Sequence, residues 1–152
     1  MRRVFFVVLF LMLYASPAGA LPGIFGGPEK VTAEGGRIVV DVSGLKTAGA
    51  KHYLYRAGGN AVRFFIVRDG QGKVRAAADA CEVCRDEGKG YKLKGGAMLC
   101  LNCGRRFPLN RIGILVGGCN PHPLNFAEDG SSVILTVREV LAAAEYFPEN
   151  RK

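Results

Sequence analysis

Histidine is scarce in this chain of 152 residues, which contains only His52 and His122. The sequence also lacks a Ser/His/acid arrangement, a glycine-rich phosphate loop leading into a helix, and a helical His-Glu-x-x-His motif. A hydrolytic or group-transfer site cannot be assembled without such groups. We therefore expect no small-molecule substrate, and the absences favour a redox carrier over a catalyst.

Long hydrophobic runs are absent after residue 14. The one such run, residues 4–14, follows the positively charged Met1-Arg2-Arg3 and precedes Ala18-Gly19-Ala20, a small-x-small cleavage signature. Its eleven residues are fewer than the roughly 20 that span a bilayer. We predict a signal peptide at residues 1–20 and an exported protein, in the periplasm or at the outer face of the cytoplasmic membrane. An uncleaved signal would instead associate the protein with the membrane.

The export route and the charge leave some alternatives open. Arg2-Arg3 followed by Val4-Phe5 is similar to a truncated twin-arginine signal, although the general secretory route is the default. Removing these two arginines leaves 19 Lys+Arg against 13 Asp+Glu, a formal charge of +6. The basic residues are scattered and no nucleic-acid-binding module is present, so we expect no nucleic-acid partner.

Short apolar stretches separated by Gly-rich turns predict a mainly β domain at residues 37–147, between an irregular lead-in (21–36) and a tail (148–152). A meander and a hairpin account for most of it. The predicted strands cover residues 38–42, 52–56, 62–67, 74–78, 91–94, 97–100 and 133–135. Thr136 and Glu139 have capping-box spacing, which predicts a short C-terminal α-helix through Tyr146 that ends at Pro148.

Two Cys-x-x-Cys pairs stand out against this background: Cys81 with Cys84, and Cys100 with Cys103. A two-residue gap lets both thiolates of a pair bind one ion, and two pairs complete a tetrahedral sulfur site. Soft sulfur ligands favour zinc or iron and exclude magnesium and calcium. Disulfides are the alternative in an oxidising compartment, but five cysteines always leave one over, and we assign that role to Cys119.

Three further residues are candidates for an additional ligand or a place beside the site. Cys119 is either a site-adjacent thiol or a buried structural cysteine. His122, in a proline-rich loop, is either a hydrogen-bond donor or ligand to the metal, or an ordinary surface histidine. His52, which opens a predicted strand, has the same two interpretations.

Basic residues surround the cysteine segment. Four thiolates around a divalent ion leave a charge of about −2, which nearby cations would partly neutralise. With iron bound, this would raise the reduction potential. The alternative is a merely solvated basic face. The surrounding residues are Arg85, Lys89, Arg105, Arg106 and Arg111.

Several motifs together resemble the FtrD-like membrane iron-sulfur containing proteins. They are Asp79-Ala80-Cys81-Glu82-Val83-Cys84, Lys89-Gly90-Tyr91, the stretch from Cys100 to Pro108 with its Cys-Gly-x-x-Phe-Pro element, and Gly117-Gly118-Cys119-Asn120-Pro121. The resemblance implies a metal-binding or iron-sulfur domain of the cell envelope, associated in some members with ferrous-iron uptake. Membrane-integrated members have several transmembrane helices, so any transport role here would be accessory.

A second resemblance concerns the Rieske iron-sulfur fold. Cys100-x-x-Cys103-Gly-x-x-Phe107 with the Gly117-Gly118 and Pro121-His122-Pro123 segments is similar to a Rieske ligand loop and proline loop. Cysteine stands here at both positions where Rieske proteins have histidine. The resemblance implies an all-cysteine relative on a small Rieske-like or metal-ribbon β-fold, with a potential lowered toward that of ferredoxins.

These observations lead to three functional hypotheses. The first is an exported iron-sulfur protein, with a [2Fe-2S] cluster, that acts in electron transfer or as an accessory to iron handling, with an envelope redox or iron-transport protein as partner. The second is a structural Zn²⁺ module that binds a protein partner, and mononuclear iron is a further option for the metal. The third is a thiol-disulfide oxidoreductase.

Overall fold

The computed structural model describes residues 27–151, so the predicted signal peptide at residues 1–20 lies outside the described residues. Strands account for 42% of the structure and helices for 15%, which confirms the mainly β prediction. The strands are β1 Glu29–Val31, β2 Arg37–Asp41, β3 Gly49–Ala57, β4 Asn60–Arg68, β5 Val74–Ala78, β6 Tyr91–Lys94, β7 Ala97–Cys100, β8 Arg106–Pro108, β9 Ala127–Asp129 and β10 Ser132–Thr136. The helices are α1 Val137–Ala142 and 3₁₀ turns at Arg85–Glu87, Leu109–Arg111, Ala143–Tyr146 and Pro148–Asn150.

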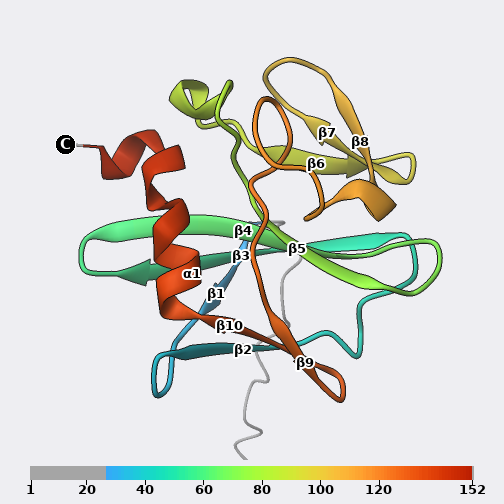
Figure 1. Ribbon diagram of the computed structural model, residues 1–152, viewed down its shortest axis with the longest axis vertical. Helices are drawn as coiled ribbons and strands as arrows, with labels where there is room; N and C mark the ends of the chain where they lie inside the picture. Colours follow the sequence, from blue (N-terminus) through green and yellow to red (C-terminus); the bar gives the residue numbers. More distant parts are fainter. Residues whose placement is uncertain (1–26, 152) are drawn as a thin grey trace, which may run out of the picture.

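The central sheet has the strand order β1-β3-β4-β5 (Figure 1). β3, β4 and β5 form the predicted antiparallel meander. β1 adds to β3 in parallel, inside the segment that was expected to be irregular. This strand was missed because three residues are too few to show an alternating pattern. An ion pair at 2.6 Å between Glu29 of β1 and Lys51 of β3 helps to hold this edge strand.

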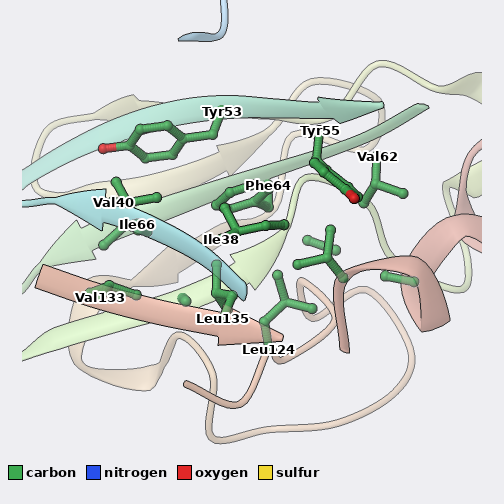
Figure 2. Packing of buried hydrophobic residues seen from close by; sticks show 14 of the residues in the cluster. Ile38, Val40, Tyr53, Tyr55, Val62, Phe64, Ile66, Leu124, Val133 and Leu135 are labelled. Carbon is green, nitrogen blue, oxygen red and sulfur yellow. The ribbon is translucent and has the colours of Figure 1, made fainter. Parts of the chain in front are cut away.

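A second sheet, β2-β10-β9, covers one face of the central sheet. β2, predicted as a strand at residues 38–42, pairs with β10, so that Ile38 lies opposite Leu135 and Val40 opposite Val133. Figure 2 shows these side chains packed against the side chains of β3 and β4. This is the first core of the protein.

The C-terminal helix begins as predicted, because the Thr136 hydroxyl accepts a hydrogen bond from the Glu139 N–H at 3.1 Å. It ends earlier than expected. The α-helix stops at Ala142 and the chain continues as a 3₁₀ turn to Tyr146. Pro148 is not simply a terminator, because it opens another 3₁₀ turn, as suits a residue whose φ is fixed and whose N–H is missing.

A third sheet, β6-β7-β8, lies on the other face of the central sheet (Figure 1). β4 is buried on both faces: Phe64 and Ile66 enter the first core, and Phe65 and Val67 enter a second core beneath the third sheet. β5 and the β6–β7 hairpin therefore meet at one end of the molecule, where both Cys-x-x-Cys segments emerge. No helix in residues 27–151 is long and apolar enough to cross a membrane.

Candidate metal centre

The first cysteine pair follows β5 directly. Cys81 is 1% exposed and belongs to the second core, whereas Cys84 is half-buried. The Cys84 N–H donates a hydrogen bond to the Cys81 Sγ at 3.4 Å, so the loop turns back on its own first sulfur. A 3₁₀ turn, Arg85–Glu87, follows and ends at Gly88 in the left-handed region, with φ of 59°.

The second pair leaves the end of β7 in a similar turn. The Cys100 N–H donates to the Arg105 carbonyl at 2.9 Å, and the Gly104 N–H to the Cys100 carbonyl at 3.0 Å. Burial raises the pKa of Cys100 to about 11, although N–H groups of Cys103 and Asn102 point at its sulfur and oppose the shift. The Arg105 N–H lowers the pKa of Cys103 in the same way. Both loops thus aim backbone N–H groups at thiol sulfur.

Three sulfurs converge. The Sγ atoms of Cys84, Cys100 and Cys103 all lie within 4.8 Å of one another. Cys81 is not part of this three-sulfur group and lies deeper, at the second core. Burial falls from Cys81 and Cys100 through Cys84 to the exposed Cys103. The donor set is soft sulfur in every case, which fits zinc, iron or an iron-sulfur cluster.

Cys119 lies beside this group. Burial raises the pKa of its thiol, and the neighbouring Cys103 thiolate raises it further, while the Arg105 charge acts in the opposite direction. Two contacts hold the Cys119 loop in place. The Glu82 carboxylate accepts a hydrogen bond from the Gly118 N–H at 2.9 Å, and the Tyr91 hydroxyl donates one to the Cys119 carbonyl at 2.8 Å.

The two histidines are not members of the three-sulfur group. The His122 ring packs on the Tyr146 ring with a centroid distance of 4.5 Å, and so faces the C-terminal segment. His52 lies under the third sheet, where its Nε2 is 3.1 Å from the Tyr91 carbonyl oxygen. Burial lowers the pKa of His52, and the contact with this carbonyl opposes the shift.

The predicted basic surround divides into different roles. Arg105 lies close enough to act on Cys119, as described above. Lys89 bridges the two cysteine loops, since its Nζ lies 3.2 Å from the Asn102 Oδ1. Arg106 instead donates to the carbonyls of Lys94 and Gly95 at the β6–β7 turn, at 2.8 and 3.2 Å. Arg85 follows the first pair directly, and Arg111 opens the loop that leads to Cys119.

Sequence reasoning missed three residues that support the site: Glu82, Asp79 and Tyr91. Tyr91 packs edge-on against Phe65 and Phe107, and its N–H donates to the Asp79 Oδ1 at 2.7 Å. Burial raises the pKa of Asp79 to about 7, opposed by this N–H and by Arg63. All three occur inside the quoted motifs, so their proximity to the cysteines in sequence was the available signal.

A β-scaffold whose loops gather cysteine sulfurs at one end defines a class of protein with a cysteine cluster that could bind a metal ion. The comparison with family models agrees. The chain belongs to the FtrD-like family, "Membrane iron-sulfur containing protein FtrD-like", whose model matches residues 45–147. This confirms the first resemblance. No curated protein and no solved structure matches the chain, so the likeness to Rieske proteins stays a prediction.

Proposed function

We propose that this chain is an exported iron-sulfur protein that transfers electrons, or assists iron handling, in the cell envelope. The observation that carries the proposal is the convergence of the Cys84, Cys100 and Cys103 sulfurs within 4.8 Å, in a chain of an iron-sulfur family. The export signal predicted at residues 1–20 supports the location. The partner proposed is an envelope redox or iron-transport protein.

The residues present suit an iron-sulfur cluster. Cys81, Cys84, Cys100 and Cys103 would hold it, and when bound it would supply one-electron oxidation and reduction. The chain's own part is to stabilise thiolate charge. N–H groups aimed at the sulfurs of Cys81, Cys100 and Cys103 do this, since hydrogen bonds to the charged form favour it.

Metal analysis with a visible spectrum tests this proposal. The protein is purified without oxygen, and iron, acid-labile sulfide and zinc are measured. About two irons and two sulfides per chain, with visible bands that bleach on reduction by dithionite, support a redox cluster of the [2Fe-2S] type. A colourless protein with one zinc per chain contradicts it.

Two serine variants locate the ligands. Cys100→Ser should abolish the bands, because Cys100 is the buried member of the three-sulfur group. Cys119→Ser is the matched control, since the proposed ligand set does not contain it. If Cys119→Ser loses as much iron as Cys100→Ser, then Cys119 would take the place of Cys81 in the proposed ligand set.

A structural zinc site is the second candidate, and the sulfur spacing favours it specifically. With a zinc–sulfur distance of about 2.3 Å, neighbouring sulfurs of a tetrahedron lie about 3.8 Å apart. Three sulfurs within 4.8 Å of one another can close around a single ion with little movement. In that case chelation would unfold the protein, and it would show no redox response between dithionite and ferricyanide.

A further inference from the structure

Exposed aliphatic side chains gather around the cysteines. Among the described residues seven large hydrophobic side chains are exposed, and five of them lie on the three loops that carry cysteines. This uneven distribution singles out one end of the protein. The five, named here the loop-tip patch, are Val83, Leu101, Ile114, Leu115 and Val116, with exposures from 42% to 73%.

Hydrogen bonds join the three loops into one surface. Glu82, beside Val83, accepts from the Gly118 N–H at 2.9 Å, which fixes the 113–118 loop to the first cysteine loop. Lys89 and Asn102 connect the first and second loops at 3.2 Å. In Figure 1 all three loops lie at the end of the molecule opposite β2 and β9. The exposed Cys103 is therefore part of the same surface as the loop-tip patch.

The rim of this surface is positively charged. Arg85, Arg105 and Arg111 have no carboxylate within 4.0 Å among the described residues. Two nearby acidic side chains are paired with cations, Asp86 with Arg151 at 2.6 Å and Glu87 with Lys89 at 3.4 Å. Glu82 keeps its charge while it accepts from the Gly118 N–H, so three arginines face one unpaired carboxylate. An apolar centre with unpaired cations around it calls for a partner with an apolar centre and carboxylates around it.

We propose that the loop-tip patch is the docking surface for an acidic redox protein, and this inference rests on the proposed function. With a cluster bound, docking would let one electron pass between it and the partner's redox centre: the donor would be oxidised, the acceptor would be reduced, and no bond would form or break. Docking excludes water from the exposed Cys103 side of the site. A small patch of this kind suits a brief, salt-sensitive encounter.

The composition of the patch favours a protein over a lipid surface. Side chains that settle at membrane interfaces are typically Trp and Tyr, whereas all five residues of the patch are aliphatic. Cys103, the exposed member of the three-sulfur group, lies in the same surface, and a charged metal site there would be costly to bury against hydrocarbon.

Binding to two cytochromes of opposite charge tests the proposal. The metal-loaded protein is titrated, at about 20 mM and about 500 mM salt, with an acidic and with a basic c-type cytochrome. The acidic cytochrome should bind at low salt and dissociate at high salt, and the basic one should not bind. Arg111→Glu should weaken binding about tenfold and Val116→Ser about threefold.

Matched controls lie elsewhere on the surface. Val39 on β2 is as apolar and 58% exposed, and Arg138 in α1 is also exposed. Val39→Ser and Arg138→Glu should leave affinity within about twofold. Equal losses in these controls, no binding of the acidic cytochrome at low salt, or binding only to vesicles of phosphatidylglycerol and phosphatidylethanolamine would overturn the docking surface.

The metal content tests the proposed function separately from the docking surface. An iron-loaded protein that fails to bind the acidic cytochrome overturns the docking surface and leaves the cluster in place. A zinc-loaded protein that binds through the loop-tip patch keeps the docking surface and overturns the electron-transfer function.

Discussion

The same substitution at two buried tyrosines should change stability in opposite directions. The Tyr91 hydroxyl donates to the Cys119 carbonyl at 2.8 Å. The Tyr53 hydroxyl is the one buried side-chain oxygen or nitrogen without a hydrogen-bond partner among the described residues. Replacement by Phe keeps each ring in its packing: Tyr91 between Phe65 and Phe107, and Tyr53 stacked on Phe64 at 5.3 Å.

The magnitudes follow from these contacts. Tyr91→Phe removes one hydrogen bond and leaves a carbonyl without its donor, so the free energy of unfolding should fall by about 1–2 kcal/mol. Tyr53→Phe removes a hydroxyl that was buried at a cost, so the free energy of unfolding should rise by about 1 kcal/mol. The two variants should therefore differ by about 2–3 kcal/mol.

Urea denaturation at neutral pH, with equal metal content verified, measures both. The midpoint should move down for Tyr91→Phe and up for Tyr53→Phe, with the slope unchanged. Cys119 should also react faster with an alkylating reagent in Tyr91→Phe, because its loop loses a tether. Shifts of the same sign and size in the two variants would refute the reasoning from hydrogen bonding.

The burial of Tyr53 should also make the stability of the protein depend on pH in the alkaline range. Burial raises its pKa in the folded state above the value of 10.0 that applies in the unfolded chain. A raised pKa means that the neutral phenol stabilises the fold fully below pH 10 and that this contribution is lost as pH rises beyond it. Above pH 10 the wild-type protein should thus lose about 1.4 kcal/mol per pH unit more than Tyr53→Phe. Parallel pH profiles would contradict this.

Substitutions at four further positions have direct expectations. Gly90→Ala should cost at least about 3 kcal/mol, because a Cβ there would lie 2.6 Å from a carboxylate oxygen and φ is +69°. Gly96→Ala, with φ of +71° and open space, should cost only about 1 kcal/mol, measured in the same urea series. Thr136→Ala should cost about 1 kcal/mol by removing the helix cap, again by urea denaturation. Glu82→Ala should speed alkylation of Cys119, whereas Glu82→Gln, which keeps an acceptor oxygen, should change it less; equal rates would contradict the tether.

Local patterns predicted the meander and the hairpin, because turn residues and short apolar runs lie next to each other in the chain. They could not predict which strands pair across the molecule. The alternating Ile38 and Val40 of β2 are buried by pairing with β10, opposite Leu135 and Val133. A local sequence pattern does not indicate which distant strand supplies that pairing. Burial on both faces of β4 follows from the same assembly of three sheets, although its unbroken apolar run was a hint.

The candidate site shows the same division. Spacing alone predicted two sulfur pairs, and the structure brings three of the four sulfurs within 4.8 Å of one another. Spacing could not say that Glu82 and Tyr91 hold the Cys119 loop beside them, because those contacts join segments 28 or more residues apart. Nor could it separate Arg105, which acts on Cys119, from Arg106, which caps a turn.

The cysteines range from buried to exposed, so the candidate site has a buried side and a solvent side. Cys81 and Cys100 are held in the second core and Cys84 is half-buried, while Cys103 is exposed on the same surface as the loop-tip patch. Under the proposed function, the buried cysteines would hold the metal centre rigidly, and the exposed Cys103 would bring that centre close to whatever docks outside. This exposure would suit a centre that exchanges electrons, since its partner must approach closely and then leave. The exposed edge at Cys103 is therefore the place where metal content, docking and redox response should be tested together.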